Sequence, residues 1–145
     1  MQGYVLNFQA NEVICREGDS LNHLYFIRTG RVLACRLVGS EVKALARIGA
    51  GEFLGELAFF DGHQRSSNII ALEPSTLIQI PRNEVWDDLP DWLKVIGQNL
   101  TKRIRTLDEI ISSTSKIRLS SKEENKPLPI EQQTLFYKIL THQNG

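Results

Sequence analysis

The sequence predicts an α+β fold in which an antiparallel β-roll of jelly-roll type carries a short internal helix and further C-terminal helices. Residues 4–80 hold short apolar runs rich in β-branched and aromatic residues, broken by turn residues every 8 to 12 positions. After Pro81 the apolar residues recur at spacings of three and four, as on a helix. The 145 residues, 41% of them hydrophobic, can bury one core.

The predicted strands follow one another as a meander of hairpins. Turn residues stand at 17–20, at Thr29-Gly30 and at Gly39-Ser40, and the segment between the last two alternates with a period of two. The strands predicted in this way are residues 4–8, 13–15, 24–28, 31–38, 42–48, 67–72 and 76–80.

Glycines crowd the segment before the predicted internal helix. Gly49, Gly51 and Gly55 fall within seven residues, a density expected where the backbone bends sharply or approaches something closely. Residues 56–60 then suit one short helical turn, and residues 61–64 read as a loop. We therefore expect a specialised loop at this place.

The helical part begins after the sheet ends at Pro81. Asn83 is a suitable N-cap for a short helix through Leu89, and Pro90 is placed to open a longer one from Asp91 to about residue 113. The longer helix carries one apolar stripe, formed by Leu93, Ile96, Leu100, Ile104, Leu107 and Ile111. This stripe either packs on the chain's own roll or joins a second copy, and its near-heptad spacing favours a homodimer.

Four segments divide the chain. Residues 1–89 form the β-roll, 90–114 the long helix, 115–129 a Ser-, Lys- and Glu-rich linker, and 130–145 a short amphipathic tail helix. A tail of this length cannot fold alone. It has to dock on the domain, on a second copy or on another protein.

Composition argues against several classes of function. Seventeen basic residues balance seventeen acidic ones, so we expect neither nucleic acid nor a membrane surface as a partner. No signal peptide and no run of 18 apolar residues is present, which predicts a cytoplasmic protein. The two cysteines and three scattered histidines lack metal-ligand spacing, and no nucleophile motif or P-loop is found, so we expect neither a metal site nor an enzyme.

The chemistry is concentrated between Gly55 and Ser67. Arg65 offers a planar fork of donors that suits a phosphate, and the two serines that follow it can bind further phosphate oxygens. Glu56 would repel a phosphate unless it addresses a sugar hydroxyl, and a cyclic nucleotide carries both groups. Alternatively, Glu56 and Arg65 form a surface ion pair worth little in stability. Spacing alone leaves both interpretations open.

Residues 12–82 resemble the cyclic nucleotide-binding domain family, which includes cAMP-dependent kinase regulatory subunits, nucleotide-gated channels and the bacterial catabolite activator protein. Four motifs in the expected order carry the resemblance. They are Arg16-Glu17-Gly18-Asp19, the segment from Leu24 to Val32, the segment from Gly51 to Ala58, and Arg65-Ser66-Ser67. The last two resemble the phosphate-binding cassette of the family.

The resemblance implies a role for each matching position. It assigns the ligand phosphate to Arg65, Ser66 and Ser67, the ribose to Glu56 and Gly55, and cassette backbone contacts to Leu57 and Ala58. It implies further that the base lies against Val32, Ala34 and Leu45, under a lid formed by Arg103, Leu107 and Asp108 of the long helix.

The expected function is that of a stand-alone, non-catalytic, bacterial-type sensor that needs no cofactor and signals to a protein effector through its C-terminal helices. Ser66 after Arg65 resembles the activator protein, so cAMP is expected ahead of cGMP and cyclic di-GMP. One alternative is an adaptor with a retired pocket. Another is a truncated transcription factor of the activator type, although the roughly thirty residues after Ser113 are too few for a DNA-reading module.

Overall fold

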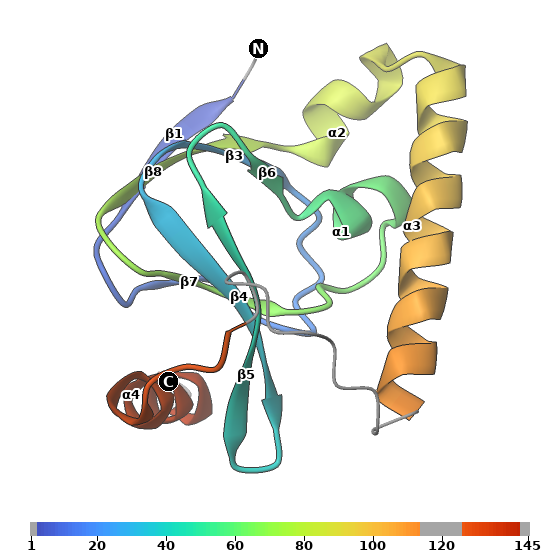
Figure 1. The fold of residues 1–145 in the computed structure, drawn as a ribbon. Coiled ribbons are helices and arrows are strands. Elements are labelled where there is room, and N and C mark those ends of the chain that lie inside the picture. The colour runs from blue at the N-terminus through green and yellow to red at the C-terminus, as the bar shows by residue number, and fades with distance from the viewer. Residues whose placement is uncertain (1–2, 114–125, 143–145) are drawn as a thin grey trace.

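The computed structural model describes residues 3–113 and 126–142, and it confirms the predicted α+β β-roll (Figure 1). Each of its two antiparallel sheets has four strands. The first sheet has the order β1 (Tyr4–Phe8), β8 (Ser75–Ile80), β3 (Leu24–Thr29) and β6 (Phe53–Leu54). The second has the order β2 (Val13–Cys15), β7 (Asn68–Ala71), β4 (Arg31–Val38) and β5 (Glu41–Gly49).

One hydrophobic core fills the space between the two sheets. Its buried members come from strands of both sheets, because alternate residues of each strand point inward. They are Cys15, Tyr25, Ile27, Val32, Ala34, Leu54, Ile69 and Leu77. The strand β6, only two residues long, escaped sequence analysis because so short a run has no periodicity.

A second core lies on the outer face of the β2-β7-β4-β5 sheet, where helix α4 (Ile130–Thr141) covers it (Figure 1). Phe136 of α4 is fully buried against Leu33 and Cys35 of β4 and their neighbours. The Gln133 side chain pairs with the backbone of Val42, accepting from its N–H and donating to its C=O, each at 2.6 Å. The tail therefore docks on the chain's own domain.

The register of the β4–β5 hairpin shifts at a bulge. Ala34 lies opposite Ala46, but Cys35 lies opposite Ala44, so Leu45 has no partner on β4. Such an extra residue breaks the alternation of faces along its strand. Leu45 consequently remains partly exposed, at 39% of its surface.

Four helical elements besides α4 complete the described chain: α1 (Glu56–Asp61), α2 (Arg82–Val85), a 3₁₀ turn η1 (Trp86–Asp88) and α3 (Asp91–Ser113). The predicted N-cap at Asn83 is wrong. The cap is Pro81, whose backbone is extended and whose carbonyl accepts the Glu84 N–H, so Asn83 lies inside the first turn. No described helix is long and apolar enough to cross a membrane.

Helix α3 presents an unexpected face to the roll. It packs beside α1, and the residues it buries there are Gly97 and Thr101. A Cβ added at Gly97 would stand 2.2 Å from the Phe60 ring, so this glycine allows the close approach. Most of the predicted stripe points away, with Ile96, Leu100, Ile104 and Leu107 each about half exposed, while Leu93 at its start is half-buried. The interpretation that the stripe covers the chain's own roll is therefore wrong.

The predicted linker at 115–129 falls mainly on residues 114–125, outside the described part of the chain. The side chain of Ile111, the last residue of the predicted stripe, also lies outside it.

Candidate functional site

A cavity of about 140 Å³ opens at the end of the roll beside α1. Its polar wall consists of the first turn of α1 and the segment that leads into β7, namely Gly55, Glu56, Leu57, Ala58, Arg65, Ser66 and Ser67. Its apolar wall is formed by Cys15, Ala34, Ile48, Leu54 and Ile69. The structure thus brings to one cavity the seven residues predicted for the phosphate, the ribose and the cassette backbone contacts.

The guanidinium of Arg65 is buried in this wall, with 5% of the residue exposed. Its Nη1 donates to the Gly55 carbonyl at 3.1 Å and its Nη2 to the His23 carbonyl, while the Tyr25 ring lies 5.6 Å below it. The buried Nε has no hydrogen-bond partner. Among the described residues no carboxylate is within ion-pair distance of this cation.

Gly55 makes the close approach of Arg65 possible. Its backbone is left-handed, with φ of 81°, which a side chain disfavours. A Cβ there would stand 2.2 Å from the Arg65 Nη1 and 2.9 Å from the His23 carbonyl oxygen. Glycine is therefore required both by conformation and by space.

The backbone of Arg65 is held by the turn between β2 and β3. The Arg65 N–H donates to the Asp19 carbonyl and the Gly18 N–H donates to the Arg65 carbonyl, both at 2.9 Å. The Asp19 carboxylate closes the turn by accepting the Arg16 N–H at 2.9 Å. The motif from Arg16 to Asp19 thus serves the site by fixing the chain on both sides of the arginine.

The first turn of α1 offers further polar groups to the cavity. A helix leaves its first backbone N–H groups without acceptors inside the helix, and Glu56, Leu57 and Ala58 occupy these positions at the cavity wall. The Glu56 side chain is exposed and makes no ion pair with Arg65, so the alternative of a surface pair between them is wrong.

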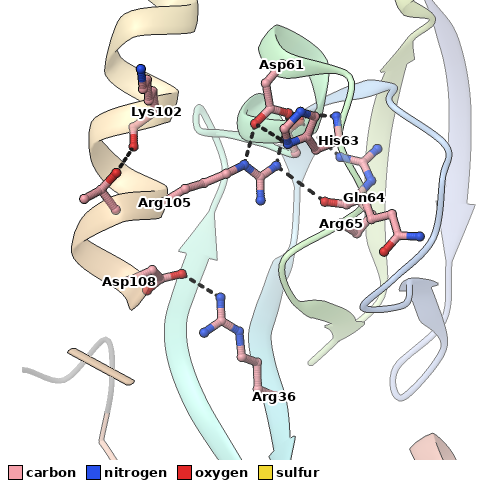
Figure 2. A network of polar contacts seen from close by, with 10 residues as sticks. Arg36, Asp61, His63, Gln64, Arg65, Lys102, Arg105 and Asp108 are labelled. Atoms are coloured by element: carbon pink, nitrogen blue, oxygen red, sulfur yellow. Dashed lines mark hydrogen bonds and ion pairs between the residues drawn. The ribbon is translucent and has the colours of Figure 1, made fainter. Parts of the chain in front are cut away.

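Two arginines connect the rim of the cavity to α3 (Figure 2). Arg105 of α3 donates two hydrogen bonds to the carboxylate of Asp61 at the end of α1, and it donates a third to the Gln64 carbonyl at 3.4 Å. Arg36 of β4 donates to the Ser66 carbonyl and to the Asp108 carboxylate, each at 2.6 Å. The segment that carries Arg65 is thus held to α3 at both ends.

The Asp61 carboxylate feels two opposing influences. Burial acts to raise the pKa of Asp61. The hydrogen bond and the charge of Arg105, together with the hydrogen bond from the His63 N–H, lower the pKa by more than burial raises it. The net effect is a pKa below the ordinary value of 3.8. In the apolar wall of the cavity, burial raises the pKa of the Cys15 thiol to about 11, so Cys15 acts there as a small apolar group.

The residues expected around the base are distributed unevenly. Ala34 lines the cavity, whereas Val32 is completely buried in the core and Leu45 stands at the bulge, neither of them in the cavity wall. Of the expected lid, only Asp108 contacts the rest of the site. Arg103 is exposed, and Leu107 lies on the outward stripe with 57% exposure.

Sequence reasoning missed several residues of the site. Arg36 and Arg105 gave no signal, because a lone arginine on a strand or helix is ordinarily a solvated residue. The apolar wall residues Cys15, Ile48, Leu54 and Ile69 were visible only as members of predicted strands or of their neighbours. Within the described part of the chain, no three His, Cys, Asp or Glu side chains gather closely enough to hold a metal ion.

A model of the cyclic nucleotide-binding domain family matches residues 5–88, more than half of the chain. The chain belongs to this family. The matched residues include both sheets, α1 and Arg65, so the cavity described above lies within this cyclic nucleotide-binding domain. Domains of this family are generally regulatory, and residues 5–88 of this chain form such a binding domain.

Two curated relatives illustrate the similarity of sequence. A cyclic nucleotide-gated cation channel of Drosophila melanogaster is 28% identical over 121 residues, which cover 74% of this chain and 18% of the channel. The cyclic AMP receptor protein of Thermus thermophilus is 32% identical over 97 residues, covering 63% of this chain and 44% of the receptor. The chain therefore spans less than half of each relative.

Solved structures show the same fold. The cAMP-bound form of the EAL enzyme Bd1971 matches with a TM-score of 0.66 and 28% identity, over 77% of this chain and 30% of that one. The catabolite activator protein of Thermus thermophilus matches with a TM-score of 0.62 and 25% identity, over 78% of this chain and 55% of that one.

Proposed function

We propose that this domain is a non-catalytic cAMP sensor of the cytoplasm. The observation that carries the proposal is the Arg65 guanidinium, which is buried, held by two carbonyls and left with one unpartnered nitrogen. A buried cation without a counter-charge is unfavourable, and an anion in the cavity would neutralise it. A cyclic phosphate fits this requirement.

The same wall supports the ribose part of the ligand. Glu56 projects from the first turn of α1 without any partner among the described residues, and its carboxylate can accept from a ribose hydroxyl. Ser66 and Ser67 stand beside Arg65 and can bind further phosphate oxygens. One solved relative, Bd1971, has both a cAMP-bound and a cGMP-bound form, so cGMP is the natural competitor in any test.

Calorimetric titration with cAMP, cGMP and cyclic di-GMP tests the proposal. We expect cAMP to bind at micromolar concentration or tighter. Arg65→Ala should weaken binding by about ten- to a hundredfold, because it removes a charge-assisted contact. Arg28→Ala, which removes an exposed arginine from β3, is the matched control and should leave binding unchanged. No heat from any of the three nucleotides, with folded and nucleotide-free protein, would favour an adaptor with a retired pocket.

We also propose that two copies pair through α3. The outward stripe of this helix is apolar and half exposed over Ile96, Leu100 and Ile104, which is an arrangement typical of a helix seam. Light scattering after gel filtration should give twice the mass of the chain. Replacing Leu100 and Ile104 by lysine should give the single mass, whereas Leu21→Lys, at a leucine elsewhere that is somewhat more exposed, should not.

Signalling to an effector would then use the C-terminal helices. On β4, the cavity-wall residue Ala34 lies between Leu33 and Cys35, which contact the tail helix. A shift of this strand on ligand binding would therefore change the position of α4. Limited proteolysis with and without cAMP checks this. Identical cleavage within residues 126–142 in both conditions would contradict it.

A further inference from the structure

We propose that the groove between strand β2 and helix α4 is a docking site for an extended, acidic segment of a partner protein. It is a second binding site, in addition to the cavity beside α1. Its occupant would be the effector of the sensor, a link that rests on the proposed function.

The groove has a volume of about 790 Å³, which lies within the roughly 300–1,000 Å³ of ordinary binding clefts. One wall is formed by residues 11–16, which include β2, and by Asp19. The other wall is one face of α4, with Leu135, Lys138 and Ile139, and His142 after it. The Arg16 Nη1 joins the two walls, because it donates to the Leu140 carbonyl at 3.4 Å.

An extended polypeptide suits this groove because β2 is an edge strand. Among the described strands of the second sheet it pairs with β7 alone, so its other edge has backbone groups that the sheet does not use. A peptide can add to such an edge through main-chain hydrogen bonds and place alternate side chains in the groove. Val13, Leu135 and Ile139 provide apolar surface for them, and Leu135 is 40% exposed.

The basic residues of the groove gather at one end of it. Lys138 and His142 are four residues apart at the end of α4, and Arg16 reaches the same end through its contact with Leu140. Lys138 and His142 are exposed. None of the three basic side chains forms an ion pair with a described residue.

The two carboxylates in the groove are engaged in their own turns. Glu12 accepts the Gln9 N–H at 3.2 Å, and Asp19 accepts the Arg16 N–H at 2.9 Å. A carboxylate of the partner can therefore pair with Lys138 and Arg16 without displacing an ion pair between described residues. An extended segment in which an acidic residue follows apolar ones meets both the apolar and the charged part of the groove.

The groove shares two structural parts with the cavity beside α1. Cys15 lines both of them. The turn that contains Arg16 and Asp19 holds the backbone of Arg65, because the Arg65 N–H donates to the Asp19 carbonyl and the Gly18 N–H to the Arg65 carbonyl. A partner in the groove would thus contact the segment that positions the proposed phosphate ligand.

Selection of random peptides displayed on phage, against the nucleotide-free protein, tests the inference. We expect the selected sequences to combine alternating apolar residues with Asp or Glu. In fluorescence-anisotropy titrations of a selected peptide, Lys138→Glu and Leu135→Ser should each weaken binding by about tenfold or more. Lys102→Glu makes the same change at an exposed lysine of α3 outside the groove, and this matched control should leave binding unchanged.

A charge-swapped peptide distinguishes a lost contact from a damaged fold. With its acidic residue replaced by lysine, the selected peptide should bind Lys138→Glu about tenfold more tightly than it binds the wild-type protein. A misfolded groove could not produce this reversal. In NMR spectra of the wild-type protein, the amide shifts caused by the peptide should concentrate in residues 13–16 and 135–142.

Selected peptides without acidic residues, or equal affinities of Lys138→Glu and the wild-type protein, would overturn the inference. Its failure is distinguishable from failure of the nucleotide site. A protein that binds such a peptide through Lys138 but binds no cyclic nucleotide would refute the sensor and leave the docking site. A protein that binds cAMP but yields no peptide dependent on the groove would refute the docking site and leave the sensor.

Discussion

The side chain of Arg65 is held in one orientation by the protein itself, as the proposed phosphate contact requires. Its guanidinium is already desolvated and oriented by the carbonyls of Gly55 and His23, and the Tyr25 ring supports it from below. The energetic penalty of burying the charge is thus incurred on folding. In the proposed complex, a phosphate would meet a guanidinium that is already oriented.

Gly55→Ala should disturb this arrangement more than an ordinary glycine substitution. The left-handed backbone alone should reduce the free energy of unfolding by roughly 1–2 kcal/mol. The new Cβ would also displace the Arg65 Nη1, from which it would stand only 2.2 Å. We therefore expect a larger loss of stability in urea denaturation together with a loss of cAMP affinity.

Gly62→Ala is the control for Gly55→Ala. Its φ of 70° is similarly left-handed, but a Cβ there meets no atom within 4 Å. It should show the backbone penalty without the loss of affinity. Equal effects of the two variants on affinity would contradict the role assigned to Gly55.

The long helix α3 is joined to the roll by charged contacts rather than by its apolar stripe. Arg105 contacts Asp61 and Gln64, and Arg36 contacts Asp108, while the stripe faces outward. An interface of this kind depends on the charge of its carboxylates. Its strength should therefore change with pH.

Acid should weaken the contact between Asp61 and Arg105. Because the pKa of Asp61 in the folded protein lies below the ordinary value of 3.8, its contribution is complete at pH values above 3.8 and is lost as the pH falls through the lower folded-state value. Asp61→Asn should reduce the free energy of unfolding at pH 7 by about 1.5–3 kcal/mol. The difference from wild type should shrink in thermal denaturation below pH 3.8.

The control for Asp61→Asn is Asp91→Asn in the first turn of α3. The Asp91 carboxylate is fully exposed and stands 3.9 Å from Lys94, an arrangement that contributes little. Its removal should leave the pH dependence unchanged. A stability difference for Asp61→Asn that is constant from pH 7 to pH 3 would be inconsistent with the ion pair.

The elements themselves were largely predictable, and their orientation was not. Strand bounds such as those of β1 and β4 followed from turn residues and period-two alternation, and Pro90 marked the start of α3. The inward face of α3 could not be predicted, because an apolar stripe is ordinarily turned toward the core. The bulge at Leu45 likewise leaves no signal in the sequence. Sequence reasoning therefore could not show that Leu45 would stand at a bulge rather than at the position expected to meet the base.

The described chain folds around two cores that share one sheet. The first lies between the sheets, and the second is completed by α4 on the outer face of the second sheet. The tail helix was predictable as an element, but its docking site was not. The roll, a second copy or another protein could each have buried its apolar residues. Its position makes the tail a structural part of the domain.

Phe136→Ala should therefore destabilise the whole domain. Phe136 is completely buried, and replacing a buried phenylalanine by alanine costs about 3–5 kcal/mol. Ile130→Ala, at a residue of the same helix that is 83% exposed, should change the free energy of unfolding by less than about 0.5 kcal/mol. Urea denaturation measures both. A small effect of Phe136→Ala would mean that α4 contributes little to the fold.

Strand β4 borders the cavity with one face and the tail helix with the other. In a comprehensive mutational scan, the effects of substitution should therefore alternate from one position of β4 to the next. Substitutions at Leu33 and Cys35 should lower protein abundance in the cell at any nucleotide concentration. Substitutions at Ala34 and Arg36 should leave abundance closer to normal and shift the dose–response to nucleotide. A single strand would thus carry two kinds of selective constraint in alternation.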